Sequence, residues 1–303
     1  MLGRVAELHY KHGMTHQQVA DLLGLSRVQV TRLLARARAE GVVEIRVHSD
    51  EPIFPVEQAA LMSRFGLESV WLAPSFDSSE ETLDSIGAVG ASYLRSVLKP
   101  GMTVAVGLSS TLARIAPQLS VDPMEVTFVP AIGSRPAGDG TVNPHQVAEL
   151  LAEATGGRAG HLPSPFLASS AEAAQMISKE PDIAHTLNQA RMADLGVFGL
   201  GGTKVHTGIL VDTLDMNMEA GELKDSGVVG DISAAFFNHR GETVRSAISQ
   251  RIVGLGMDEI LALPHRAAFA GGRDKIDSIR GALNGQIVTT LVTDIDTARA
   301  LLD

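Results

Sequence analysis

The sequence contains no cysteine, which excludes disulfide scaffolds, thiolate nucleophiles and cysteine-ligated zinc. Aromatic residues make up only 4% of the chain, and the single Trp71 lies in a short apolar run typical of a core. No apolar run is long enough to span a bilayer, and the segment after Met1 lacks the uninterrupted apolar stretch of a signal peptide. These absences predict a cytoplasmic protein that makes no membrane contact.

The short motifs of metal and cofactor chemistry are also missing. The ten histidines show neither HxH nor HExxH spacing. GxSxG and GxGxxG do not occur either, so a serine-hydrolase elbow and a dinucleotide fingerprint have no support. We therefore expect no metal and no cofactor.

Charge is distributed unevenly along the chain. The 303 residues are 45% hydrophobic and 20% charged, which predicts a folded protein of two domains. Of the formal charge of −10, residues 1–50 contribute +2, from seven Lys or Arg against five Asp or Glu, and the remainder contributes −12. A mildly basic head on an acidic body favours a head that approaches nucleic-acid phosphate.

The head has the spacing of a helix-turn-helix. Three helices are expected, over residues 3–12, 16–23 and 27–40. Thr15 and Ser26 are suitable N-caps for the second and third of these helices. Alternating apolar and polar residues at 42–48 then predict a strand, which would make this a winged helix-turn-helix.

The third helix should present one face to DNA. Val30, Leu33, Leu34 and Ala37 recur at helical spacing and form one apolar stripe, which leaves the opposite face free for a major groove. We assign base contacts to Arg27, Gln29, Thr31 and Arg32, because Arg can bind guanine and Gln adenine with two hydrogen bonds. The rest of the DNA-binding set, expected mainly near phosphate, is Thr15, His16, Gln17, Ser26 and Arg36. The alternative is a three-helix protein-interaction module whose arginines are merely solvated.

A linker and a large second domain follow. Two prolines in the segment EPIFP indicate a linker, and residues 55–65 look like a helix that could pack against a second subunit. From residue 67 onward, short apolar runs alternate with helical stretches, which predicts an α/β, Rossmann-like domain whose parallel sheet is covered on both faces. The expected domains are 1–50, 51–66 (linker and oligomerisation helix) and 67–303. Among the helices expected in the last are 82–98, 110–118, 143–155, 170–192, 273–283 and 295–302.

Several strand-end loops of this domain could bind a small molecule. MTVAVGLSSTLARIA at 102–116 reads as strand, loop and helix, and its amides and hydroxyls could bind an anion. Asp231 could accept hydrogen bonds from a sugar. Lys275 is expected in the first turn of a helix, where its charge interacts unfavourably with the helix dipole, and an anionic ligand would offset this interaction. The effector set is Gly107, Ser109, Ser110, Thr111, Gly133, Ser134, Asp231 and Lys275. The alternatives are an ordinary capped turn, an exposed cap and a solvated lysine.

Taken together, these segments resemble the SorC family of sugar-binding transcriptional regulators. The blocks that carry the resemblance are GMTHQQVADLLGLSRVQVTRLLARARAEGVVEIRV, LKPGMTVAVGLSST, NPHQVAELLAEATGG, HLPSPF, VGDISAAFFNHRG and AGGRDKIDSIRGALNGQIVTTLVTDIDTARALL. The resemblance implies a sensor fold similar to the glucosamine-6-phosphate deaminase and ribose-5-phosphate isomerase group. It also implies a phosphorylated sugar or polyol as effector and a homo-oligomer, commonly a tetramer. By position it places Gly107, Ser109, Ser110 and Thr111 at a phosphate loop, and Asp231 and Lys275 at polar effector positions.

The sequence thus predicts a transcriptional regulator of a carbohydrate catabolic operon. Its affinity for double-stranded operator DNA would be controlled by a small sugar, a sugar phosphate or a polyol. One alternative is a phosphosugar isomerase or deaminase with a DNA-binding head, which needs a general base and acid that the sequence does not clearly offer. The other is an architectural protein whose pocket has no ligand.

Overall fold

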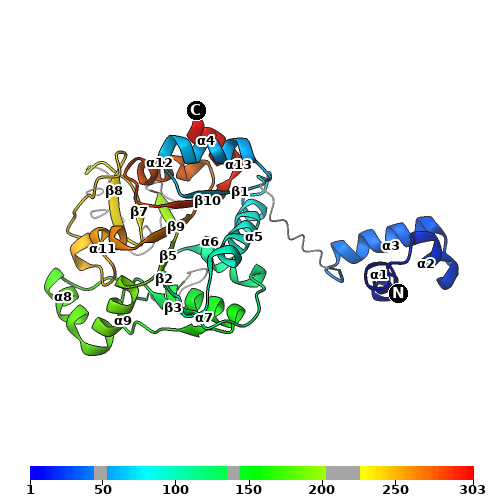
Figure 1. Ribbon diagram of the computed structural model, residues 1–303, viewed down its shortest axis with the longest axis horizontal. Coiled ribbons are helices and arrows are strands. Elements are labelled where there is room, and N and C mark those ends of the chain that lie inside the picture. Colours follow the sequence, from blue (N-terminus) through cyan, green and yellow to red (C-terminus); the bar gives the residue numbers. More distant parts are fainter. Residues whose placement is uncertain (44–52, 135–142, 203–225) are drawn as a thin grey trace. The chain divides into compact units, whose positions relative to one another are not determined.

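The computed structural model describes residues 1–43, 53–134, 143–202 and 226–303 (Figure 1). The chain divides into two compact units, Met1–Asp50 and Glu51–Asp303. The strand expected at 42–48 falls almost wholly outside the described residues. No helix of the described part is both long and apolar enough to cross a membrane.

The first unit is a small bundle of helices around one apolar cluster. This cluster includes Val5, Val19 and Val30, which come from three different helices and have no exposed surface. Thr15 and Ser26 cap their helices as predicted, each within a reciprocal capping box. The helices are α1 Leu2–Ala6, continued by the π-helix η1 Glu7–Lys11, then α2 His16–Leu23 and α3 Arg27–Ala39.

The second unit is built on a seven-stranded parallel sheet in the order β1-β10-β9-β5-β2-β3-β4. Its central strands read as almost continuous apolar runs because both faces of the sheet are covered. The chain runs outward from β2 to β3 and β4, then returns through β5 toward β9 and β10. The strands are β1 Ser69–Ala73, β2 Thr103–Val106, β3 Thr127–Pro130, β4 Arg158–Ala159, β5 Leu195–Phe198, β9 His265–Phe269 and β10 Thr290–Asp294.

Helices cover both faces of this sheet, which confirms the predicted α/β class. Alternate strand residues enter different cores: Val104 and Val106 pack with α5, α6 and α7, whereas Ala105 packs with α4, α9, α11, α12 and α13. The helices are α4 Pro55–Phe65, α5 Ser79–Val97, α6 Ser110–Ala113, α7 Pro144–Thr155, α8 Ala171–Lys179, α9 Pro181–Arg191, α11 Met257–Ala262, α12 Ile276–Asn284 and α13 Ile295–Leu302. Short 3-10 turns are η2 Ala116–Gln118, η3 Ser249–Arg251 and η4 Arg273–Lys275.

Helix α4 belongs to the second unit. It lies beside α13 near the C-terminus (Figure 1), it packs on β1, and its Leu61 is fully buried. Arg64 of α4 donates a hydrogen bond to the Leu302 carbonyl at the end of α13. Val56 on the outer side remains 76% exposed, so the predicted contact of this helix with a second subunit stays a prediction.

A second sheet, which the sequence did not predict, lies on the carboxyl side of β5. Its three antiparallel strands, in the order β6-β7-β8, are β6 Leu200–Gly202, β7 Val228–Ile232 and β8 Ala235–Asn238. Ile232 pairs with Ala235, so Ser233 and Ala234 form a two-residue hairpin turn. Both residues have positive φ, 48° and 63°, as a type I′ turn requires. Ser-Ala occupies this turn in place of the usual signal, Asn-Gly or Asp-Gly.

Candidate DNA-binding face and effector site

Helix α3 presents the face that the sequence predicted. Val30, Leu34 and Ala37 are buried against the rest of the first unit. On the opposite side Arg27, Thr31 and Arg32 are exposed. This face also carries Val28, whose side chain is 77% exposed and suited to an apolar contact such as a thymine methyl.

Local hydrogen bonds already hold several of the predicted contact residues. The Gln29 side-chain oxygen accepts a bond from the Ser26 amide at 2.8 Å, within the capping box. Reading adenine with both ends of this amide would therefore require the cap to open, because bidentate binding needs the same oxygen. Thr15 is engaged in the same way at the start of α2, where its hydroxyl accepts from the Gln18 amide.

The other polar side chains of the head differ in how far they are restrained. Thr31 donates to the Arg27 carbonyl and contacts His16 Nδ1, each at 3.1 Å, which ties α2 to α3. Gln17 donates to Asp21, and Arg36 forms an exposed ion pair with Glu40 at 2.7 Å. The Arg27 and Arg32 side chains make no hydrogen bond or ion pair with another described residue. Those two guanidinium groups are therefore ready to reach a ligand.

The loop after β2 corrects the predicted anion site. The Ser109 hydroxyl caps α6 by accepting from the amides of Thr111 and Leu112, at 3.1 and 3.3 Å. Two of the amides expected to bind an anion are therefore occupied. The helix predicted over 110–118 is only the four residues of α6, followed by η2, so its dipole is small. The Thr111 hydroxyl is buried and has no partner among the described residues.

The β7–β8 hairpin tip is seated on this loop. The Leu108 amide donates to the Ser233 hydroxyl at 3.3 Å, and Ser233 is buried. A Cβ atom at Gly107 would lie 2.4 Å from the same oxygen, so only glycine allows this approach. Sequence reasoning found Gly107 but missed Ser233, since nothing local to Ser233 signals a long-range contact.

Asp231 and Lys275 come together at the same edge of the sheet. The Asp231 carboxylate accepts from the Ala234 amide at 3.0 Å, and a Cβ atom at Gly201 would lie 2.0 Å from that carboxylate. Burial raises the pKa of Asp231, while the Ala234 amide and Lys275 act to lower it. Burial likewise lowers the pKa of Lys275, and Asp231 opposes this. The two charges thus stabilise each other where solvent does so poorly.

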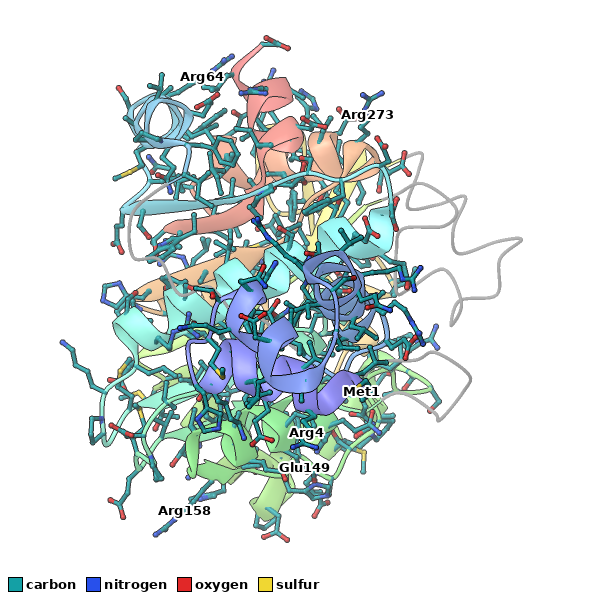
Figure 2. All side chains as sticks on the ribbon, turned by 90° about the vertical axis from the view of Figure 1, so that its right-hand side faces the viewer. Met1, Arg4, Arg64, Glu149, Arg158 and Arg273 are labelled. Atoms are coloured by element: carbon teal, nitrogen blue, oxygen red, sulfur yellow. The ribbon has the colours of Figure 1, made fainter. Side chains whose placement is uncertain are left out.

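The position of Lys275 differs from the prediction. It ends the 3-10 turn η4 and is the N-cap residue of α12, so it precedes the first turn of the helix instead of lying within it. Its neighbour Arg273 is exposed and points away from the body of the unit (Figure 2). Gly272, with φ 96°, precedes both residues and turns the chain into η4.

Gly133 and Ser134 lie one strand further along, after β3. Both are held by their neighbours through the backbone: Gly133 N donates to Val253 O at 2.9 Å and Ser134 N to Ser164 O at 2.8 Å. A Cβ atom at Gly133 would lie 2.4 Å from the Pro165 carbonyl oxygen. Close packing therefore accounts for this glycine, and a contact with an effector stays a prediction.

Asp294 organises the loop that carries Lys275, and sequence reasoning missed it. Its buried carboxylate, at the end of β10, accepts four hydrogen bonds. The donors are Ser75 Oγ at 2.9 Å, Gly272 N at 3.0 Å, and the amide and hydroxyl of Thr297 at 2.9 and 2.6 Å. An acid ending an apolar strand, with threonine three residues later, is the N-cap signal that could have identified it. A cleft of about 660 Å³ opens here, with Ser110 and Lys275 in its wall.

These loops meet where ligands bind in open α/β sheets. Strand β2 lies between β5 and β3, and the chain leaves this point in opposite directions, so a crevice forms at the carboxyl ends of the strands. Charged, hydroxyl and amide groups converge at this edge from β2, β9 and the hairpin. Among the described residues no group of three His, Asp or Glu side chains could hold a metal ion. The arrangement offers an ammonium group, carboxylates and hydroxyls to a small polar molecule.

Comparison with known proteins supports both halves of this description. A family model of a sugar-binding domain matches residues 55–303, and one of a Crp-like helix-turn-helix domain matches residues 3–62. Transcriptional regulator LsrR of Enterobacter sp. (strain 638) is 30% identical over 100% of this chain and 92% of its own length. The erythritol catabolism regulatory protein EryD of Brucella abortus (strain 2308) is 28% identical over 99% and 95%. The full-length sorbitol operon regulator SorC from Klebsiella pneumoniae shares the fold, with a TM-score of 0.82 at 24% identity over 100% and 98% of the two chains.

Proposed function

Because the chain belongs to the SorC family of sugar-binding transcriptional regulators, we propose that it controls a carbohydrate catabolic operon by binding operator DNA under the control of a small polar effector. In this proposal residues 1–50 bind DNA, residues 51–66 link the units and assist oligomerisation, and residues 67–303 bind the effector. Such a regulator acts in the cytoplasm, where operator DNA lies.

The effector we propose is a phosphorylated sugar or polyol. The observation that carries this is that Lys275 and Ser110, at the start of α6, line one cleft, with the Asp231 carboxylate near enough to Lys275 to interact with it electrostatically. An ammonium group there can bind phosphate, and a carboxylate can accept hydrogen bonds from sugar hydroxyls. The named roles of relatives, in erythritol catabolism and in a sorbitol operon, support polyhydroxylated compounds as the class.

On DNA, α3 enters the major groove with Arg27 and Arg32 at base edges. His16, Gln17 and Arg36 lie nearer to phosphate in this arrangement, and Thr15 and Ser26 set the helix starts. Two or four copies of the chain bind paired half-sites. The effector favours one arrangement of subunits and so changes operator affinity.

We propose that the protein is a receptor and not an enzyme. The sensor unit is expected to resemble the glucosamine-6-phosphate deaminase and ribose-5-phosphate isomerase group, so the enzyme alternative has a direct test. Turnover of sugar phosphates needs a positioned base and acid. Incubating the protein with a panel of sugar phosphates and analysing them by NMR should show no conversion.

A two-part experiment tests the proposed function. A thermal-shift screen of sugar phosphates and free polyols identifies the effector, which should raise the melting temperature. Fluorescence anisotropy with DNA from upstream of the protein's own and neighbouring genes should then show salt-sensitive, sequence-specific binding that the effector alters. Folded protein that prefers none of these sequences would contradict the proposal.

A further inference from the structure

Two histidines form a pair on the other flank of the β2–α6 loop. His145 Nδ1 lies 3.1 Å from His161 Nδ1, and the rings meet edge to face with centroids 4.7 Å apart. His145 is 6% exposed, whereas His161 is exposed. Asn143, which caps α7, accepts a hydrogen bond from the His145 amide at 3.2 Å and so fixes where this side chain begins.

The pair leaves one buried polar atom unsatisfied. Since both contacting atoms are Nδ1, one ring donates and the other accepts, and the Nε2 atom of each neutral ring then has the opposite role to its own Nδ1. His145 Nε2 is buried and makes no hydrogen bond with any part of the chain that the structure describes. A buried donor or acceptor without a partner is costly, so this atom calls for one.

The surroundings keep His145 neutral. Burial lowers the pKa of His145, and His161 adds to this, while Glu149 and the Leu162 carbonyl act in the opposite direction. A neutral imidazole offers a single donor or acceptor and no charge. Its chemistry therefore matches a hydroxyl group better than a phosphate.

The pair lies close to the predicted effector loop. Strands β2 and β3 are hydrogen-bonded neighbours, about 4.8 Å apart, and α6 and α7 follow them at the same edge. Helix α6 packs on α7, and Leu112 and Val147 of these helices belong to the same buried apolar cluster. The Thr111 hydroxyl of α6 is the second buried polar group here without a partner among the described residues. One strand spacing is within the length of a small sugar phosphate.

We propose that His145 is a specificity-determining residue that reads a hydroxyl group of the effector, and that His161 is the positioning residue that sets which nitrogen of His145 carries the proton. This rests on the proposed function and deepens it. The effector is then held on both sides of the β2–α6 loop, by Asp231 and Lys275 on one and by His145 on the other. It is a compound with hydroxyls at more than one end of its chain.

Calorimetry on the full-length protein tests the proposal. The probes are sorbitol 6-phosphate, erythritol 4-phosphate, ribose 5-phosphate and 2-deoxyribose 5-phosphate. For the tightest-binding probe, His145→Leu should weaken binding about tenfold or more, and His145→Gln, which keeps a donor and an acceptor, should recover most of it. The matched control is His185→Leu, an exposed histidine on α9, which should bind as the wild type does.

Nitrogen NMR of the wild type gives an answer even if His145→Leu fails to fold. Adding the tightest-binding probe should shift the His145 Nε2 resonance, and His161→Leu should change the tautomer of His145 before any ligand is added. If His145→Leu bound the probe with unchanged affinity, or if the Nε2 resonance did not move in the saturated wild type, this proposal would be overturned and the proposed function would stand. Failure of the wild type to bind any probe would overturn the effector class proposed above, and this proposal with it.

Discussion

Arg27 and Arg32 are the arginines of α3 predicted at base edges, and no described neighbour holds them, whereas Arg36 is already paired with Glu40. We expect Arg32→Ala to lose specific operator binding, by about 1–3 kcal/mol for each half-site contact, because a bidentate contact to guanine disappears. Arg36→Ala should weaken binding to all sequences alike and reduce the salt dependence by about one ion. Anisotropy titrations with operator and scrambled DNA at several salt concentrations separate the two.

Both substitutions lie on the exposed side of α3, so the melting temperature and effector binding should be unchanged. Equal losses on operator and scrambled DNA for Arg32→Ala would show that this side chain contacts only phosphate.

Lys275 makes effector affinity depend on pH in a direction that its pKa fixes. Burial lowers this pKa from the ordinary 10.5, with Asp231 in opposition. As pH rises through this lowered pKa toward the ordinary value, the ammonium loses its proton and its attraction for a phosphate. We expect sugar-phosphate affinity, measured by calorimetry, to fall over this pH range. In Lys275→Arg the affinity should fall much less, because arginine stays charged.

The stability of the effector-free protein should change in the opposite direction. Between the lowered folded pKa and the ordinary unfolded one, the unfolded chain binds more protons at Lys275, so its contribution to folding rises with pH. Asp231, whose pKa is raised, contributes stability at low pH that is lost as pH rises through its folded value. Affinity and melting temperature falling together above neutrality would contradict this role for Lys275.

At the scale of elements, the β7–β8 hairpin positions the effector site by resting on the β2–α6 loop. Ser233→Ala removes the acceptor of the Leu108 amide, which then stays buried without a partner, at a cost of about 1–3 kcal/mol. We expect a lower melting temperature and weaker effector binding, with operator binding unaffected. Ser246→Ala is the control: it removes a part-buried serine hydroxyl that accepts from the Ser249 amide at 3.1 Å, outside this loop. If Ser233→Ala bound the effector as tightly as the wild type, the contact between the hairpin and the β2–α6 loop would have no part in effector binding.

The elements that the sequence predicted are those whose determinants are local. Thr15 and Ser26 identified two helix starts, and the apolar stripe of α3 identified its buried face. The parallel sheet followed from apolar runs that alternate with helices. The β7–β8 hairpin was missed because Ser233 and Ala234 adopt positive φ without the residues that usually announce it. Tertiary contacts override local preference there, as they do where α6 ends after four residues.

The candidate site was predictable only in part for the same reason. Asp231 follows Gly230 and Lys275 comes three residues after Gly272, but the electrostatic interaction between them across 44 positions is a property of the fold. Ser233 and His145 act through long-range contacts that no spacing rule contains, whereas Asp294 carried a local N-cap signal. Ser109 was correctly placed in the loop, yet its hydroxyl turned out to occupy the very amides it was expected to leave open.

At the scale of the whole molecule, charge assigns the two units different partners. Net charge is +2 in residues 1–50 and −12 in the remainder, so the larger part repels DNA and only the head is drawn to it. The head contributes few cations, so one copy should bind weakly and operator affinity should depend on several heads acting together. An effector that alters how copies assemble can therefore control DNA binding without touching the head.

Thermodynamic linkage makes this control measurable in both directions. If the effector changes operator affinity by a coupling free energy of about 1–3 kcal/mol, a factor of roughly 5–150, operator DNA must change effector affinity by the same factor. Calorimetric titration of the effector into free protein and into the operator complex should give two dissociation constants whose ratio equals that from anisotropy titrations of DNA with and without effector. Lys275→Ala should bind operator normally while its ratio approaches one, because the coupling begins at the effector. Two ratios that disagree would mean that assembly changed between the experiments, whereas two ratios of one in the wild type would separate the DNA-binding head from the pocket and refute the sensor role.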